Sequence, residues 1–541
     1  MNDEVSRARN IFRGSATRRL VLGGGAATIG TLASRQGSAQ AGRRRVTIGT
    51  TADVQIYNPL VSNSRTDTWV LQLMYPRLMQ MDADGNKVAA LATAWSYTPD
   101  GLTARLTIRD DFVWSDGTKL TAEDVAFTAS AVAREKIGVA ASYTAVMDAV
   151  RAVSPTEVEF TLKHVNGPFL GGIGFWMPIV PAHVFGKVDS VKSFANDKDW
   201  VSAGPFRLVS VERGQRYVMQ RTERYPLAAG GRANVEEIEF RVFPDVNSLS
   251  LALRSGELDI CAATLPLNLA KSLDGQNGVK TQTVPSLGWS HIMYNLKRPP
   301  LDRAEVRQAL AYAANPAAVR AVALQGQARA TGSGPQSPVI AAYFDPTLPE
   351  YGYDPDRARQ LLESAGFKRG RGGMYDGLSF NIIFDQADPY VSNWVQIVRD
   401  SSRDAGIDIR LAGTERNTWL QRSRNSDFDL YAGSWAILED PPASLDLCYR
   451  TGSFINYGGI SDPELDGLLD RCAQALTPQA AVEPVHLATR LVHDRMYNNV
   501  LYVQDFNVAF NAGRVQGLEA RPSDLLSLIN PGSLANMRVV G

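Results

Sequence analysis

The side chains that could carry out chemistry are few and widely spaced. Five histidines occur, His164, His183, His291, His486 and His493, and the last two lie seven residues apart. Two histidines on a helix bind one metal ion best at a spacing of four residues, so this pair better suits a partly buried structural role. The chain contains no G-x-S-x-G elbow, P-loop, H-E-x-x-H or paired C-x-x-C. The sequence therefore predicts no enzyme, no bound metal and no other cofactor.

Other side chains suit binding better than catalysis. Trp435 is followed by Glu439 and Asp440, and Asp388 and Tyr390 stand in a Gln-Ala-Asp-Pro-Tyr segment. An indole ring can stack on a sugar, a peptide bond or a cationic group. Carboxylates would suit a cationic or hydroxyl-rich molecule. Each Trp is also a natural core residue, and the segment around Glu439 equally fits a turn with solvated carboxylates, so both interpretations stay open.

Short strands form part of the framework that must position these side chains. Apolar and polar residues alternate over residues 102–109 and again over 158–162, which is typical of half-buried strands. Strands are also predicted over residues 46–49, 378–384 and 407–411. These segments are separated by stretches of a different period.

Helices alternate with these strands. Thr121 and Asp124 form a capping box at the start of one helix, Asp302 caps a second, and Asp354 caps a third, which has a proline at its first position. The Gly-rich segment 171–174 lacks the context of a dinucleotide fingerprint and predicts a loop. Alternating strands and helices predict α/β architecture.

Composition and charge are those of an ordinary globular protein. The chain has 541 residues, 44% of them hydrophobic and 21% charged, which predicts two to four domains. Its formal net charge of +0 provides no excess of basic residues for nucleic acid, so we expect no nucleic-acid partner.

Residues 1–41 have the features of an export signal. Basic residues up to the pair Arg18 and Arg19 precede a weakly apolar, Gly-rich stretch, and the segment ends in Ala39-Gln40-Ala41. The apolar part is shorter than the ~20 residues needed to span a bilayer. The Arg pair resembles a twin-arginine signal, and an ordinary secretory signal is the alternative. We predict cleavage near Ala41 and a mature protein in the periplasm without a membrane anchor.

The three cysteines are too few for a disulfide scaffold. Export would permit one bridge, and sequence proximity favours Cys448 with Cys472. The alternative is that these two and Cys261 are all buried thiols.

A series of short blocks lies along the chain at residues 57–60, 91–95, 99–103, 106–110, 114–118, 120–125, 203–206, 255–259, 294–295, 306–313, 353–355 and 365–367. One block is Trp114-Ser115-Asp116-Gly117-Thr118. In their sequence and in their order over some 310 residues, the blocks resemble the extracellular solute-binding proteins, family 5, of ABC transporters, a family of peptide and nickel type.

The resemblance implies a periplasmic-binding-protein fold of type II, cluster C, with two α/β lobes joined by a hinge and an extra domain in one lobe. Ligand would be held between closing lobes, and a monomer would deliver it to an ABC permease and ATPase complex. On this basis the chain divides into residues 42–80 (lobe I, first part), 81–202 (extra domain), 203–290 (lobe I, second part), 291–508 (lobe II) and 509–541 (lobe I, C-terminal part).

Two departures from the family pattern bear on the ligand. Counting from Trp435, the acid that would pair with a peptide's amino group falls on Leu438, and acids come one and two residues later. Asp388 stands where dipeptide binders carry an Arg for the carboxylate, and an Asp would repel that group. We predict a site formed by Trp435, Glu439, Asp440, Asp388, Tyr390, Trp289, Thr51 and Asn456.

The resemblance favours an oligopeptide or peptide-like ligand. Opines, oligosaccharides, cationic compounds and metal chelates are the alternatives within the same fold. A periplasmic chaperone or sensor and a secreted hydrolase are the rival functions, although the hydrolase would need a nucleophile and base that the sequence does not reveal.

Overall fold

The computed structural model describes residues 44–541 except residues 63, 436–437, 524 and 541. The predicted signal, residues 1–41, and its cleavage site lie outside the described residues.

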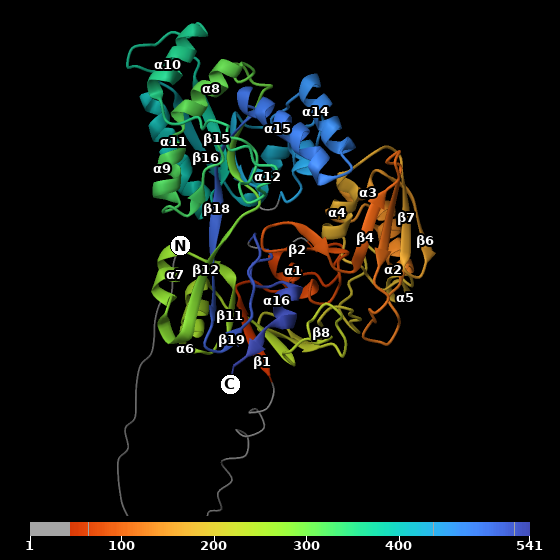
Figure 1. Ribbon diagram of the computed structural model, residues 1–541. Coiled ribbons are helices and arrows are strands. Elements are labelled where there is room, and N and C mark those ends of the chain that lie inside the picture. The colour runs from red at the N-terminus through yellow and green to blue at the C-terminus, as the bar shows by residue number, and fades with distance from the viewer. Residues whose placement is uncertain (1–43, 63, 436–437, 524, 541) are drawn as a thin grey trace, which may run out of the picture. The chain divides into compact units, whose positions relative to one another are not determined.

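One mixed sheet runs through the protein, and a single long strand belongs to both of its halves (Figure 1). This strand is β18 (Asn498–Asn511). Residues 498–502 pair with β13 (Ser290–Tyr294), and residues 505–511 pair with β12 (Val279–Pro285). The chain therefore crosses between two lobes at two adjacent places, near Gln504 and between β12 and β13.

The lobe I half of the sheet surrounds β1 (Arg45–Thr50), which pairs in parallel with both neighbours. Burial of all but the first residue of β1 explains why this strand is a continuous apolar and small-residue run rather than an alternating one. Its sheet neighbours and the associated helices are β8 (Phe206–Glu212), β9 (Arg216–Arg221), β10 (Glu237–Val242), β11 (Ile260–Leu265), α1 (Arg65–Leu71), α6 (Val246–Ser255), α7 (Leu267–Leu273) and α16 (Pro531–Asn536).

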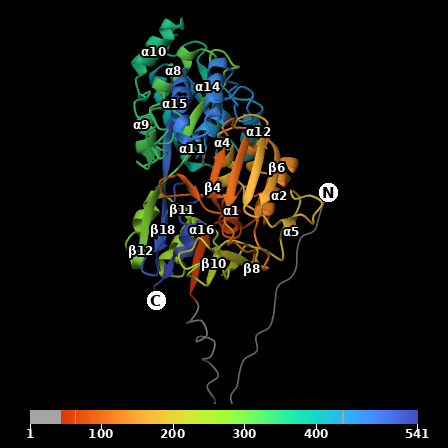
Figure 2. The ribbon, with the colours of Figure 1, turned by 45° about the vertical axis from the view of Figure 1, so that its right-hand side comes forward.

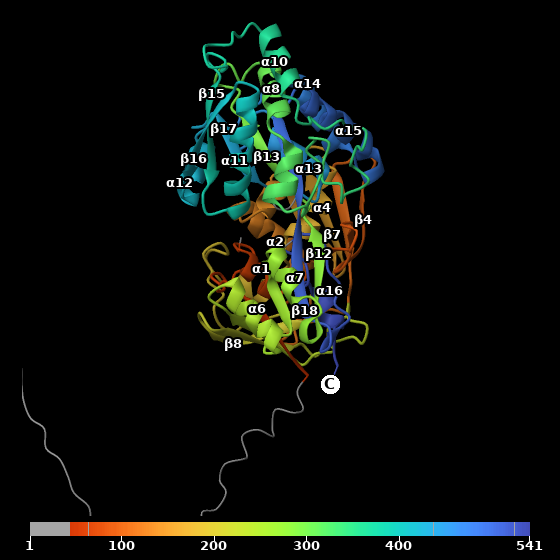
Figure 3. The same cartoon turned by 90° about the vertical axis from the view of Figure 1, so that its left-hand side faces the viewer.

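The lobe II half is built around β15 (Ser379–Asp385), which lies between the parallel strands β16 (Asp408–Thr414) and β17 (Leu430–Ser434). Helix α11 (Pro389–Asp404) packs on β15 and β16 (Figure 3). The other helices of this lobe are α8 (Ala304–Ala313), α10 (Pro355–Ser364), α12 (Arg416–Arg424), α13 (Pro441–Tyr449), α14 (Pro463–Gln474) and α15 (Pro478–Asp494).

A separate antiparallel sheet with the order β4-β5-β7-β6 lies within the predicted extra domain (Figure 2). In β5 (Thr103–Ile108) every second residue is buried, as the alternation predicts. Helix α2 (Ala122–Glu135) packs on this sheet and begins with the predicted capping box, in which Asp124 accepts a hydrogen bond from the Thr121 N–H at 3.0 Å. The other strands are β4 (Ala92–Tyr97), β6 (Met147–Ser154) and β7 (Glu157–Leu162).

The remaining elements are short. They are β2 (Met79–Met81), β3 (Lys87–Ala89), α3 (Ala140–Thr144), α4 (Pro168–Trp176), α5 (Ala182–Phe185), η1 (Gln276–Gly278), α9 (Pro316–Ala318), η2 (Val319–Ala323), β14 (Ala328–Arg329), β19 (Val515–Gln516) and β20 (Arg538–Val539).

Two local predictions need correction. The predicted loop at residues 171–174 is part of α4, because Pro168 starts this helix and the close approach of the Tyr143 ring leaves space only for glycine at Gly172. Helix α8 is confirmed, but its N-cap is Arg303 rather than Asp302, and Arg303 makes no side-chain capping bond. Asp354 is confirmed as the cap of α10.

The predicted domain boundaries can be located on the elements. The division at 290/291 falls at the start of β13, and that at 508/509 falls inside β18, a few residues after the pairing changes from one lobe to the other. The segment boundaries stay predictions. In the described part of the chain, no helix is both long enough and apolar enough to cross a membrane.

The three cysteines are free and buried, so the structure does not form the Cys448–Cys472 bridge, and the alternative of buried thiols describes it. Burial raises the pKa of the Cys261 and Cys472 thiols to about 12 and raises the pKa of Cys448 as well. Neutral, inaccessible thiols are poor nucleophiles.

We therefore expect a thiol reagent at neutral pH to leave the native protein unmodified and to modify three thiols after unfolding. A reducing agent should leave the melting temperature unchanged. Mass spectrometry of the labelled protein and a thermal melt measure both results, and a melting temperature that falls on reduction would instead reveal a bridge.

Candidate binding cleft

A cavity of about 800 Å³ lies where the chain crosses between the lobes. This volume is within the ~300–1,000 Å³ typical of small-molecule sites. Residues that follow the carboxyl ends of β1, β15 and β17 line it, a common place for ligands in α/β folds. Both lobes contribute: the lining residues include Thr51, Arg65, Trp69, Asp245, Thr264, Trp289, Ser290, Asp385, Asp388, Tyr390, Arg416, Ser434, Trp435, Gln504 and Phe506.

Aromatic side chains form a wall of this cleft on the lobe II side. The Trp435 N–H donates to the Trp289 carbonyl oxygen at 2.9 Å, so the two residues are fixed to each other by the backbone. The Trp435 ring contacts His291, with ring centres 5.7 Å apart, and Tyr457, at 6.3 Å. The buried indole nitrogens of Trp289 and Trp435 have no hydrogen-bond partner among the described residues. Both nitrogens are therefore covered by the surrounding protein, and the rings rather than the N–H groups face the cleft.

The carboxylates of the cleft already have partners within the protein. Asp388 caps α11 by accepting from the Tyr390 and Val391 N–H groups at 2.9 and 3.1 Å. Burial raises the pKa of Asp388, and its two backbone hydrogen bonds oppose that rise. Asp385 pairs with Arg416 at 3.1 Å. These acids position α11 and α12, and they do not by themselves make the cleft a cation site.

Five of the eight predicted site residues lie together in this cleft: Thr51, Trp289, Asp388, Tyr390 and Trp435. Asn456 does not line it. Its side chain bonds the Arg450 and Ile460 carbonyl oxygens and the Ile460 N–H, which holds a turn in place. The assignment of these residues to ligand binding stays a prediction.

Glu439 and Asp440 also lie outside the cleft lining, and they contact an internal cation instead. Lys87 Nζ is 2.6 Å from Asp440 Oδ2 and 3.8 Å from Glu439 Oε1. Trp176 Nε1 donates to Glu439 Oε1 at 2.8 Å, and Asp440 caps α13. These contacts join the region of β3 and α4 to lobe II. We call Lys87, Glu439 and Asp440 the interlobe ion cluster.

The charged groups of this cluster shift one another's pKa values. Burial lowers the pKa of Lys87, but the Asp440 and Glu439 carboxylates outweigh burial, so the net shift is upward. Burial raises the pKa of Glu439, and Lys87 only partly opposes it. The cluster is therefore held together by a lysine that stays charged beside one deeply buried carboxylate.

Sequence reasoning missed several cleft residues, among them Arg65, Asp245, Arg416 and Gln504. Each stands in a segment that has no distinctive motif, and they come together only because strands far apart in sequence end at the same place. The one available signal was positional, since Asp245 and Arg416 stand at or next to helix starts.

Another cavity of about 1,010 Å³ separates the extra sheet from α13 and α14, and none of the predicted site residues lines it. It lies away from the two crossing segments. Within the described ranges, no three His, Cys, Asp or Glu side chains are grouped so as to hold a metal ion. His291 is fully buried between aromatic rings, and burial lowers its pKa to about 3.

Two lobes that share a strand and enclose a cleft at the crossing define a two-lobed binding protein. Comparison with known proteins agrees with this class. The model of the bacterial extracellular solute-binding proteins, family 5 (middle), matches residues 87–456. The chain belongs to this family, whose members bind small solutes and work with the permeases of ABC transporters.

Relatives cover most of the chain. The oligopeptide-binding protein AppA of Bacillus subtilis is 24% identical over 84% of this chain and 85% of its own. The nickel-binding periplasmic protein of Escherichia coli is 28% identical over 69% of this chain and 72% of its own. The structure of AppA in complex with a nonapeptide matches with a TM-score of 0.74 and 22% identity, over 92% of this chain and 99% of that one.

The ABC transporter substrate-binding protein CtaP of Listeria monocytogenes matches with a TM-score of 0.81 and 20% identity, over 92% of this chain and 100% of that one. The predicted family and the two-lobed type II fold are confirmed.

Proposed function

We propose that this protein captures a peptide or peptide-like solute in the cleft and delivers it to an ABC permease and ATPase without altering it chemically. The single observation that carries the proposal is the cavity of about 800 Å³, lined by the indole rings of Trp289 and Trp435 and by residues of both lobes. Residues on both sides contact one ligand only when the lobes are together, so the ligand stabilises the closed arrangement.

The cleft chemistry fits the backbone of a peptide. Peptide bonds offer flat faces on which the rings of Trp289 and Trp435 can stack. Ser290, Ser434 and Thr264 add hydroxyl groups that both donate and accept. The name of AppA, an oligopeptide-binding protein, supports the same class of ligand. Opines, oligosaccharides, cationic compounds and metal chelates are the second candidates for the same cleft.

The remaining features of the proposal concern export and assembly. We propose a twin-arginine signal over residues 1–41, with cleavage near Ala41, a location in the periplasm, and a monomer in solution. The name of the nickel-binding periplasmic protein supports this location.

The proposal is tested with mature protein that has been unfolded and refolded to remove carried-over ligand. Thermal melts are recorded against oligopeptides, opines, oligosaccharides, polyamines and nickel chelates. A ligand at 100 times its dissociation constant stabilises the native state by about 2.7 kcal/mol, which is readily detected. We expect oligopeptides to raise the melting temperature and mass spectrometry to recover them intact.

A rise with non-peptide compounds alone would move the assignment to that class. Cleavage of the peptide during incubation would contradict a role without catalysis. No rise with any compound, from protein shown to be folded, would contradict the proposed ligand classes.

A further inference from the structure

A side chamber of about 330 Å³ adjoins the cleft. Arg65 lines both the cleft and this chamber, so the two spaces share this residue as part of their walls. The chamber is lined by residues near α1, by α3 and α4, and by Arg77. About 30 Å³ is the volume of one water molecule, so the chamber is large enough for a functional group of a ligand.

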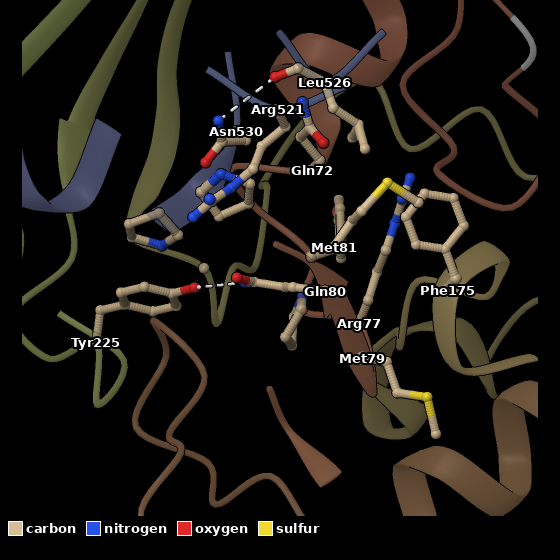
Figure 4. A pocket seen from close by; sticks show the side chains of 15 residues that line it. Gln72, Arg77, Met79, Gln80, Met81, Phe175, Tyr225, Arg521, Leu526 and Asn530 are labelled. Carbon is tan, nitrogen blue, oxygen red and sulfur yellow. Dashed lines mark hydrogen bonds between the residues drawn. The ribbon is translucent and has the colours of Figure 1, made fainter. Parts of the chain in front are cut away.

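Arg77 is the notable residue of this chamber. Its guanidinium lies over the Phe175 ring, with 5.2 Å between the guanidinium carbon and the ring centre (Figure 4). Its buried Nε has no hydrogen-bond partner, and its side chain forms no ion pair with any residue in the described part of the chain. Burial lowers the pKa of Arg77 to about 10, and the nearby charge of Glu439 only partly opposes that. Arg77 nevertheless stays protonated at neutral pH.

The charged side chains that line the chamber are all basic. Its described lining contains two arginines together with Ser62, Ser64, Thr68 and Gln72, and it contains no Asp or Glu. The nearest carboxylate with an effect on Arg77 is Glu439, which Lys87 and Trp176 already contact. A partly buried cation without a paired anion is unfavourable, and an anionic ligand group would supply that anion.

We propose that Arg77 binds an anionic group of the ligand, such as a carboxylate, in the side chamber while the rest of the ligand lies in the cleft. This inference rests on the proposed function, because it describes one end of the same bound solute. A planar guanidinium donates two parallel hydrogen bonds to a carboxylate, and stacking on Phe175 keeps it in one orientation.

A smaller space of about 30 Å³, which Arg77 also lines, is too small for this group. It is lined by Gln80, Tyr225 and Met81, with Gln80 and Tyr225 joined by a hydrogen bond of 3.4 Å (Figure 4). It has room for about one water molecule. The anion is therefore assigned to the larger chamber.

The first test uses simple anions, so that it does not depend on identifying the solute. Acetate, citrate, sulfate and inorganic phosphate are titrated at constant ionic strength into wild type, Arg77→Met and Arg77→Lys. We expect citrate and at least one other anion to bind wild type, Arg77→Met to weaken binding about tenfold to a hundredfold, and Arg77→Lys to fall between them. Arg410→Met, an exposed arginine paired with Asp408, removes the same charge elsewhere and should behave as wild type.

The second test separates a ligand carboxylate from a free anion. Oligopeptides with a free C-terminal carboxylate are compared with the same peptides amidated. We expect amidation to weaken binding to wild type and to have no effect on Arg77→Met, whose affinity for the amidated peptides stays that of wild type. Anion binding that depends on Arg77 without any peptide binding would support the inference and overturn the peptide proposal. Wild-type anion binding that Arg77→Met retains, or no anion binding at all, would overturn the inference and leave the peptide proposal standing.

Discussion

Replacing Lys87 with Met should destabilise the native protein by about 3 kcal/mol at neutral pH, because it leaves two carboxylates of the interlobe ion cluster without their cation. Glu439 is the critical partner, since its side chain is only 3% exposed. Asp440 is more accessible and caps α13, so it retains other partners. The expected loss of stability is therefore at the lower end of the range for breaking a buried ion pair. Urea unfolding, monitored by circular dichroism, measures it.

The pH dependence of this loss has a definite sign. Burial raises the pKa of Glu439 in the folded state, so its favourable contribution is fully present below its unfolded value and is lost as the pH rises through the folded value. In Lys87→Met the only cation opposing this shift within the cluster is gone, and the pKa rises further. Arg77 and Tyr143 also face Glu439, and both are unchanged in the variant. The difference in stability between wild type and variant should therefore shrink as the pH is lowered from neutral toward 4.5, the ordinary pKa of this carboxyl group.

Two further variants distinguish this explanation from a general loss of packing. Lys271→Met removes an exposed lysine of α7 and should change stability by less than about 0.5 kcal/mol. Adding Glu439→Gln to Lys87→Met should restore part of the stability, because the more deeply buried of the two carboxylates no longer carries a charge. A loss for Lys87→Met that is independent of pH, or that Glu439→Gln makes worse, would contradict the ion-cluster account.

The ion cluster also shows where sequence reasoning stops. Local signals predicted the elements well when they act within a few residues: the alternation in β5, the capping box of α2 and the Asp354 cap of α10 are all present. The Gly-rich segment in α4 was misjudged because glycine there serves close packing against Tyr143, which no local pattern reveals.

The candidate site was predictable only in part for the same reason. Trp289, Trp435 and Asp388 were placed in the predicted site because they stand in or beside segments that resemble the family, and all three line the cleft. The contact of Glu439 and Asp440 with Lys87 could not be predicted, because Lys87 stands 353 residues from Asp440 and has no motif of its own. Without that contact, both carboxylates were assigned to the ligand. Arg77 was missed because a single arginine in an apolar stretch is not distinctive in sequence. Only the folded structure shows that it lines a chamber without a carboxylate beside it.

Replacing Trp435 with Ala should weaken binding of the solute at least about thirtyfold, as is usual for an aromatic residue at the centre of a binding surface. Trp435 is the better choice than Trp289 for this test. Trp289 is 2% exposed, so truncating it would leave a cavity in the core and destabilise the fold. Trp435 is less buried, and its backbone N–H contact to Trp289 is independent of its side chain. Calorimetric titration with the compound that stabilises wild type measures the change.

Trp435→Phe and Trp95→Ala make the result specific. The Phe variant keeps a ring for stacking and removes an indole N–H that the protein covers, so it should bind more tightly than the Ala variant. Trp95 is 40% exposed on β4 of the extra sheet and does not line the cleft, so its removal should leave binding unchanged. If Trp435→Ala bound as tightly as wild type while folded, the cleft would not be the ligand site. The cavity between the extra sheet and α13 would then be the place to look, because it is the larger space and none of its walls includes Trp435.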